Sequence, residues 1–213
     1  MKLYSYFRSS ASYRVRIALA LKGIGYETVP IRLREGDQDA PAYRAVNPQG
    51  LVPALVDGDN VLVQSLAIIE YLEETVPEPR LLPASPADRA HVRALAQIIA
   101  CDIHPLNNLR VRAAALTELG VSEAQRQAWI EKWIDLGFAA FEAMVADDPR
   151  TGRFCYGDSP SLADICLVPQ IFNARGAKMD LTPYPTLTRI AEACAALPAF
   201  ASAAPERQPD AVA

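Results

Sequence analysis

The chain has 213 residues, of which 51% are hydrophobic and 22% charged, with a formal net charge of -4. This composition excludes intrinsic disorder, argues against a nucleic-acid partner, and offers no uncharged run near the ~20 apolar residues of a membrane span. The N-terminus lacks a secretory signal pattern and the four cysteines form no C-x-x-C pair. We therefore expect a soluble, cytoplasmic protein with free thiols.

The distribution of alanine predicts two domains. Of 36 alanines, 8 lie in the first 82 residues and 28 in the rest. Because alanine is the best helix former, the first part reads as mixed α/β and the second as all-helical. Between them, residues 76–86 contain four prolines, a density that ends helices and central strands. We expect domain boundaries at 1–82 and 87–213.

The first domain is predicted to alternate strands and helices. The patterns indicate a strand at 2–6, a helix at 14–22, a strand at 26–33, a weak helix at 40–45, strands at 53–57 and 61–63, and a helix at 65–74. The turn Asp57-Gly58-Asp59-Asn60 between the last two strands is typical of a hairpin. This order, with its closing hairpin, predicts a thioredoxin-like fold.

The second domain is predicted to be a set of amphipathic helices. They cover 87–104, 122–145, 165–174 and 187–196, and Pro105 should kink or end the first. Ser161 and Asp164 have the spacing of a capping box before a very apolar helix, which we expect at the buried centre. The tail at 205–209 is polar and flanked by prolines, so we expect it to be extended.

The polar break after the first strand could bind an anion. Ser9, Ser10 and Ser12 supply hydroxyls at the start of the first predicted helix, where free N–H groups and the helix dipole favour negative charge. A thiolate there would be stabilised, which lowers a thiol pKa from about 8.5. No cysteine lies nearby, so the thiol would come from a ligand. The alternative is that one serine only caps the helix.

Two further segments suit a peptide-like ligand. Gln64 and Ser65 stand where a strand ends and a helix begins, and could bind a carboxylate or simply cap the helix. A cis bond between Val52 and Pro53 would leave the Val52 backbone groups free to pair with an extended peptide.

Residues 101–110 form the most unusual polar stretch of the second half. Cys101 and His104 are three apart, but zinc needs three or four ligands and no matching second pair appears, so we expect no metal. His104 could be a general base or a hydrogen-bonded structural histidine. Arg8, Arg110 and Arg175 could bind carboxylates or be ordinary surface arginines.

Several motifs together resemble zeta-class glutathione transferases, the maleylacetoacetate isomerases. The specific block is Ser-Ser-x-Ser-x-Arg-Val-Arg-Ile-Ala-Leu, which begins at Ser9. The likeness continues through residues 47–48, 51–53, 64–72, 101–110, 164–170 and 180–185, so it covers nearly the whole chain. It implies the glutathione transferase fold, a thioredoxin-like α/β domain followed by an all-α domain, in a cytosolic homodimer with glutathione as cofactor.

The resemblance also implies roles for individual residues. Ser9 would hold the glutathione thiolate, with Ser10 and Ala11 beside it, and Gln64 and Ser65 would hold the γ-glutamyl carboxylate. The remaining implied glutathione or cleft residues are Gln38, Val52, Asp102, His104, Asn108, Leu109 and Arg110. Arg8, Arg110 and Arg175 would hold an acidic substrate, and Arg175 with Ser9 and Ser10 would be catalytic. Many relatives have cysteine where this chain has Ala11.

The implied reaction is glutathione-dependent cis–trans isomerisation of maleylacetoacetate, a small dicarboxylic keto acid from tyrosine breakdown. Reversible thiolate addition to the cis double bond, rotation and expulsion would leave the trans isomer. The alternatives are a maleylpyruvate isomerase, a glutathione transferase or dehalogenase acting on small α-halo acids, and a binding module without turnover. The serines and Gln64 argue against the last alternative, because a scaffold would not need them.

Overall fold

The chain divides by its internal contacts into two units in this computed structural model, which describes residues 1–211. The first unit is Met1–Leu81 together with the residues from Ala196 onward, and the second is Leu82–Ala195. The C-terminal residues, expected in the second domain, group with the first unit because α9 (Pro198–Ala203) packs against α1 (Ser10–Leu21).

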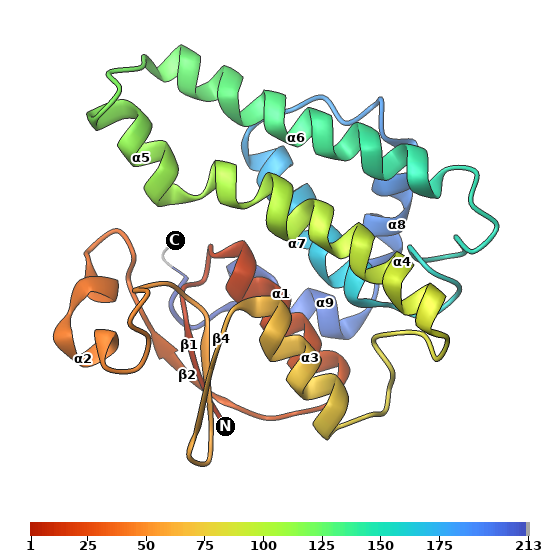
Figure 1. Ribbon diagram of the computed structural model, residues 1–213, viewed down its shortest axis with the longest axis horizontal. Helices are drawn as coiled ribbons and strands as arrows, with labels where there is room; N and C mark the ends of the chain where they lie inside the picture. The colour runs from red at the N-terminus through yellow and green to blue at the C-terminus, as the bar shows by residue number, and fades with distance from the viewer. Residues whose placement is uncertain (212–213) are drawn as a thin grey trace. The chain divides into compact units, whose positions relative to one another are not determined.

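A four-stranded mixed sheet forms the base of the first unit (Figure 1). Its strands are β1 (Lys2–Ser5), β2 (Glu27–Pro30), β3 (Ala54–Asp57) and β4 (Asn60–Val63). The order is β2-β1-β3-β4, with β1 parallel to β2 and antiparallel to β3. β3 and β4 pair from Asp57 with Asn60 outward, which confirms the predicted hairpin.

Two helices of the first unit contact each other, and both begin at serines. α1 is buried along most of its length, and it packs against α3 (Ser65–Thr75) as well as α9. α1 starts four residues before the predicted Arg14, because the polar residues after Ser9 form its first turn. Between β2 and β3 lie a short 3-10 turn, Asp37–Asp39, and α2 (Pro41–Arg44).

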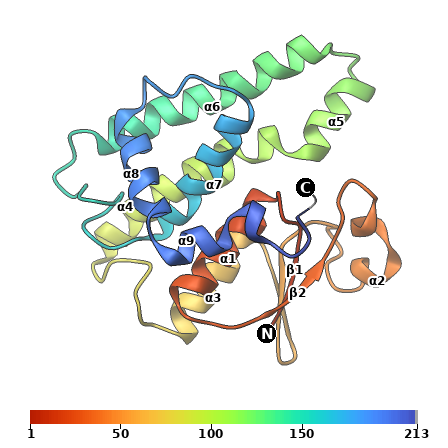
Figure 2. The same cartoon turned by 180° about the vertical axis from the view of Figure 1, so that it is seen from behind.

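The C-terminal residues do not form the extended tail expected at 205–209. Residues Pro205–Arg207 form a 3-10 turn directly after α9. Gln208 is buried, and its side-chain amide donates to the carbonyls of Ser202 and Ala204 at 3.0 and 2.9 Å. These contacts fold the segment back on α9, which Figure 2 shows beside α1.

The second unit is helical throughout its regular structure. It comprises α4 (Pro86–Gln97), a π-helical segment (Ile98–Ile103), a 3-10 turn (Pro105–Asn107), α5 (Leu109–Thr117), α6 (Glu123–Val145), α7 (Leu162–Gly176) and α8 (Pro185–Ala195). α7 is buried at most of its positions, so the prediction of a central apolar helix is confirmed. Both oxygens of the Asp164 carboxylate accept hydrogen bonds, and Ser161 completes the predicted capping box.

The first helix of this unit changes its winding before Pro105. The α-helical part ends at Gln97, and the π-helical segment packs against α6 at Gly137, where any Cβ would collide with the Ile103 side chain. Glycine at this position therefore lets the two backbones approach closely. The segment presents Cys101 and Asp102 to solvent while Ile99 and Ile103 are buried.

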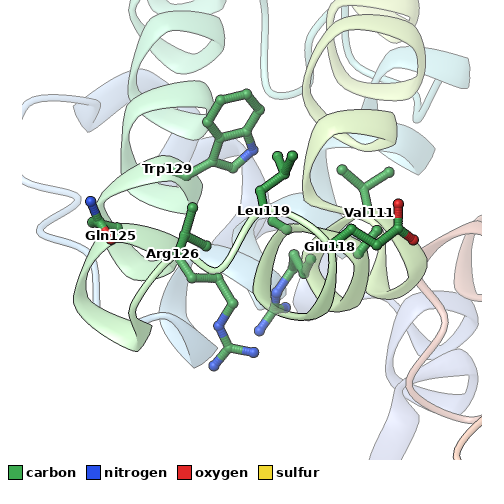
Figure 3. A pocket seen from close by; sticks show the side chains of 10 residues that line it. Val111, Glu118, Leu119, Gln125, Arg126 and Trp129 are labelled. Carbon is green, nitrogen blue, oxygen red and sulfur yellow. The ribbon is translucent and has the colours of Figure 1, made fainter.

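α5 and the start of α6 form an exposed apolar hairpin. No α5 residue is buried, which explains why the sequence pattern did not predict this helix. A pocket of about 460 Å³ lies between α5 and α6, lined among others by Val111, Leu119 and Trp129 (Figure 3). None of the expected site residues lines it, so it is separate from the chemistry expected of the chain.

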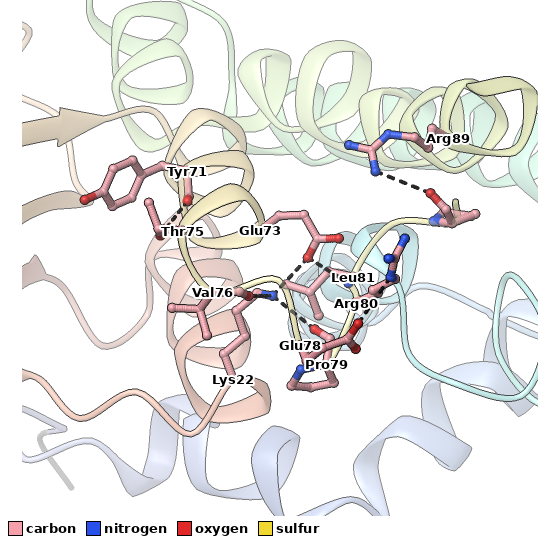
Figure 4. A network of polar contacts seen from close by, with 11 residues as sticks. Lys22, Tyr71, Glu73, Thr75, Val76, Glu78, Pro79, Arg80, Leu81 and Arg89 are labelled. Carbon is pink, nitrogen blue, oxygen red and sulfur yellow. Dashed lines mark hydrogen bonds and ion pairs between the residues drawn. The ribbon is translucent and has the colours of Figure 1, made fainter. Parts of the chain in front are cut away.

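The proline-rich segment is anchored to the first unit by a buried ion pair. Lys22 Nζ lies 2.9 Å from Glu73 Oε2 and also donates to the carbonyls of Val76 and Pro79 (Figure 4). Glu73 in turn accepts from the Leu81 backbone N–H at 2.9 Å. The paired charges and added hydrogen bonds offset the desolvation cost of burial.

Within residues 1–211, no helix combines the length and apolar character needed to cross a membrane.

Candidate active site

The Ser9 hydroxyl caps α1 and still has a donor available. Ser9 Oγ accepts a hydrogen bond from the Ser12 backbone N–H at 3.2 Å. A serine hydroxyl also has one proton to donate, so capping and donation to an anion use different parts of the same group. The two interpretations left open by the sequence are therefore compatible. Ser10 is buried and Ala11 half-buried in the first turn that follows.

Ser65 stands at the start of α3, one position further into its helix than Ser9 in α1. It is the first residue of the helix, it is buried, and its Oγ accepts from Arg14 Nη1 at 3.3 Å. Gln64, just before it, is exposed and has φ of 70°, a conformation that non-glycine residues rarely adopt. Its amide donates to Gln49 Oε1 at 2.9 Å.

Arg14 is a candidate functional residue that was not expected from the sequence, where it marked a predicted helix start and one position of the family block. The signal was available: Arg14 and Arg16 interrupt a helix whose other positions between Tyr13 and Leu19 are apolar, yet both arginines are 2% exposed or less. Arginine is rarely buried unless its donors are used, so two arginines in such a helix indicate structural or functional partners.

Val52 and Gln38 lie in the loops between β2 and β3. Val52 is buried in a cluster with Ile31 and Tyr43, and the Val52–Pro53 peptide bond is cis. Gln38 lies within the 3-10 turn, where its amide donates to Asp39 Oδ2 at 3.1 Å. The Gln38 carbonyl oxygen Oε1 is buried and has no hydrogen-bond partner among residues 1–211.

Most expected site residues of the second unit lie in the π-helical segment or directly after it. Asn108 caps α5 by accepting from the Arg110 backbone N–H at 3.1 Å, and its amide nitrogen lies 3.4 Å from His104 Nε2. Asp102, Leu109 and Arg110 are exposed. π-helical turns occur often at functional sites, which fits the polar character of this stretch. No group of three His, Cys, Asp or Glu side chains that could hold a metal occurs in the described chain.

The three candidate substrate arginines all expose their side chains. Arg8 lies in the loop between β1 and α1 of the first unit. Arg110 lies in the first turn of α5, and Arg175 in the last turn of α7, both in the second unit. Exposed guanidinium groups remain charged and can bind an anionic ligand bidentately.

Comparison with known proteins adds family-level findings to this geometry. Residues 3–80 match the profile "Glutathione S-transferase, N-terminal domain", and residues 123–201 match "Glutathione S-transferase, C-terminal domain". The maleylacetoacetate isomerase of Rhizobium meliloti is 53% identical over 206 residues, which cover 96% of each chain.

Two solved structures are similar over their full length. A holo maleylpyruvate isomerase, described as a bacterial glutathione S-transferase in the zeta class, has a TM-score of 0.98 and 50% identity, covering 100% of both chains. A maleylacetoacetate isomerase from Methylobacterium extorquens AM1, with bound malonate and glutathione, has a TM-score of 0.97 and 46% identity, covering 100% of both chains. These findings confirm the predicted fold class, a thioredoxin-like α/β domain plus an all-helical domain.

Proposed function

Because this chain belongs to the zeta class of the glutathione S-transferase family, we propose that it is a glutathione-dependent isomerase that converts maleylacetoacetate to fumarylacetoacetate. The observation that carries this proposal is the Ser9 hydroxyl, which stands at the N-terminus of α1 with its oxygen bonded to Ser12 N–H. Its proton is not used by the helix cap and is therefore available to a thiolate.

The residues of the first unit fit glutathione. Ser9, Ser10 and Ala11 form a helix N-terminus suited to a thiolate, and Ser65 forms a second one suited to a carboxylate. The buried Gln38 Oε1, which lacks a donor among residues 1–211, suits an N–H group of a peptide ligand. Val52, through its backbone, and Gln64 complete the set.

Glutathione supplies a thiolate that adds to one carbon of the cis double bond, leaving a single bond that rotates before the same C–S bond breaks and releases the trans isomer. Ser9 donates a hydrogen bond from its hydroxyl to the sulfur, and the α1 N–H groups add positive potential. Both the hydrogen bond and the potential lower the thiol pKa. Arg175, with Arg8 and Arg110, neutralises the substrate carboxylates and the negative charge that develops on its keto oxygen.

The remaining assignments belong to the same proposal. We propose that Asp102, His104, Asn108, Leu109 and Arg110 contribute to the binding of glutathione and substrate. We propose that residues 1–82 bind glutathione and that the substrate-cleft residues lie within 87–213, of which the segment from Ala196 groups with the first unit. We also propose that the protein is a cytoplasmic homodimer of tyrosine catabolism. The likeness to the isomerases at about half identity over whole chains supports these assignments.

Maleylpyruvate isomerisation is a second candidate. The 0.98 TM-score and 50% identity to a maleylpyruvate isomerase favour it as directly as the other relatives favour maleylacetoacetate. Both substrates are short maleyl keto acids with the same reacting double bond, so the same serine and arginines serve either one.

One assay tests both candidates. The protein is mixed with glutathione and each maleyl acid in turn, and loss of the cis isomer is followed by absorbance and NMR. We expect turnover that requires glutathione and leaves its concentration unchanged, with the higher kcat/KM identifying the substrate. Isomerisation without glutathione, or net consumption of glutathione, would contradict the proposal.

A further inference from the structure

The loop that carries Ser9 is held by two side chains that the expected mechanism does not use. The loop runs from Tyr6 to Ser9, between β1 and α1, and it is short enough that its peptide groups determine where the Ser9 hydroxyl points. The Ser9 backbone N–H donates to the Tyr6 carbonyl at 3.0 Å, which closes the turn. Any group that fixes the peptide groups of Tyr6 and Phe7 therefore also fixes Ser9.

Arg16 lies in the second turn of α1 and holds this loop through its guanidinium group. Its Nη2 donates to the Phe7 carbonyl at 3.0 Å, and its Nη1 donates to the Tyr6 carbonyl at 3.5 Å and to Ser5 Oγ at 3.2 Å. The Tyr6 carbonyl thus accepts from both Arg16 and Ser9. Arg16 is 1% exposed, and burial lowers the pKa of its guanidinium to about 10, so it remains charged at neutral pH.

Asp210 holds the same loop from the opposite end of the chain. Its Oδ2 accepts from the Phe7 backbone N–H at 3.0 Å, a contact between residues 203 positions apart. Its other oxygen, Oδ1, is buried and has no hydrogen-bond partner in the described part of the chain. Because Asp210 lies close enough to Arg16 to raise the pKa of the guanidinium, the carboxylate also balances part of the buried charge.

The C-terminal segment is itself tied to Arg16. The third nitrogen of this side chain, Nε, donates to the Ala203 carbonyl at 3.0 Å, at the end of α9. Gln208 then bonds back to the Ser202 and Ala204 carbonyls, which brings the chain round to Asp210. One side chain therefore joins the Ser9 loop and the C-terminal segment in the first unit.

We propose that Asp210 and Arg16 are positioning residues that hold the Ser9 loop, so that the C-terminal segment contributes to thiol activation. The inference rests on the proposed function in one respect only, that Ser9 faces the glutathione sulfur. Neither residue touches the sulfur. Asp210 acts through the Phe7 peptide, and Arg16 through the carbonyls of Tyr6 and Phe7.

The test compares Asp210→Ala, Asp210→Asn and the control Glu206→Gln, which removes an exposed carboxylate from the same segment. The first readout is the pKa of the glutathione thiol bound to the protein, titrated by the ultraviolet absorbance of the thiolate. For Asp210→Ala we expect the pKa of the bound thiol to rise by about one unit. At a pH below the wild-type pKa, this rise means about tenfold less thiolate. Asp210→Asn keeps an oxygen that accepts from Phe7 N–H, so we expect it to restore most of the loss. Glu206→Gln should match the wild type.

The second readout requires neither glutathione nor turnover. Amide hydrogen exchange of Phe7 and Ser9 should be about tenfold faster in Asp210→Ala than in the wild type and Glu206→Gln. A lower melting temperature with unchanged thiol pKa and unchanged exchange at Phe7 and Ser9 would overturn the inference. If the wild type fails to bind glutathione, the proposed function fails while the exchange measurement still decides whether Asp210 holds the loop. If Asp210→Ala does not fold, both measurements are made on Asp210→Asn. We expect smaller changes of the same sign in this variant. If neither the thiol pKa nor the exchange rates change, the inference is overturned.

Discussion

Arg14 Nη1 donates to Ser65 Oγ at 3.3 Å, which joins the second turn of α1 to the start of α3 inside the first unit. The bond occupies the serine oxygen as an acceptor, so the hydroxyl proton is left for a ligand. It also places a buried positive charge behind the α3 N-terminus, where the helix dipole already favours an anion. The site expected to hold the γ-glutamyl carboxylate therefore has a charged support that the sequence motif alone did not reveal.

Ser65→Ala should weaken glutathione binding by about 10- to 10²-fold, because a hydrogen bond to a charged carboxylate contributes roughly 1.5–3 kcal/mol. Calorimetry measures the dissociation constant. A glutathione analogue without the γ-glutamyl α-carboxylate should lose little affinity on the same substitution. Ser122→Ala, which removes an exposed helix cap in the second unit, is the matched control and should leave binding unchanged. An equal loss for glutathione and the analogue would contradict the assigned contact.

Ser9→Ala should lower kcat by about 10²-fold, as expected when one oriented donor to a developing or stabilised anion is lost. Ser9→Gly separates this effect from capping, since glycine costs a helix N-cap only a few tenths of a kcal/mol. We expect the same loss of kcat in both variants and a lower melting temperature only in Ser9→Ala. Unchanged turnover in either variant would remove Ser9 from the mechanism.

Arg175→Ala should reduce kcat/KM for the maleyl acid by about 10²-fold while glutathione binding persists. The reason is that an exposed guanidinium can pair with a substrate carboxylate, whereas the groups assigned to glutathione thiolate and carboxylate lie in the first unit. Steady-state kinetics and calorimetry measure the two effects separately. Arg80→Ala, which removes another exposed arginine, serves as control. Equal losses of substrate and glutathione binding would count against this assignment.

The two capping boxes of the second unit should differ in their effect on stability. The Asp164 carboxylate is fully buried and accepts from the backbone N–H groups of Cys155 and Ser161 at 2.8 and 2.7 Å and from the Ser161 hydroxyl. Removing it leaves buried donors unsatisfied, so Asp164→Ala should cost about 3 kcal/mol. Ser122→Ala, in the exposed box of α6, should cost about 1 kcal/mol. Denaturant unfolding measures both values, and equal costs would show that burial is not the deciding factor.

His91 should make the protein less stable as the pH falls. Burial, and then the charge of Arg150, lower the pKa of His91, while Asp148 and Asp88 raise it by smaller amounts. The unfolded chain, with a histidine pKa of about 6.5, therefore takes up a proton before the folded chain does. The free energy of unfolding then falls as pH decreases below that value, until the folded pKa is reached.

Melting temperatures between pH 8 and pH 5 measure this contribution. His91→Asn should flatten the dependence in the range just below about pH 6.5, where histidine titrates. The pKa of Asp148 is lowered chiefly by its hydrogen bond to Arg150, so this residue also reduces the free energy of unfolding, at more acidic pH. His91→Asn retains that loss of stability. A wild type and variant with the same slope around pH 6 would contradict the prediction.

Local signals in the sequence predicted much of the fold. The hairpin at Asp57–Asn60, the Ser9 cap of α1 and the capping box at Ser161 each depend on contacts within a few residues. Turn geometry and helix capping act over that distance, so the residue types alone indicate them. The roles assigned to the individual site residues stay predictions that the variants above test.

Tertiary structure decided the features that depend on contacts distant along the chain. Trp129 and Leu136 read as apolar positions of α6 yet are 43% and 52% exposed, because burial depends on which face finds a partner. The apolar neighbours of Arg14 and Arg16 signal burial, but only the fold shows their partners, which are Ser65 for Arg14 and the peptide groups beside Ser9 for Arg16. The sequence by itself determined the order of strands and helices in the first 75 residues and the serines at two helix starts. Only the tertiary structure brought Asp210 to Phe7, because a hydrogen bond across 203 positions leaves no local pattern to read.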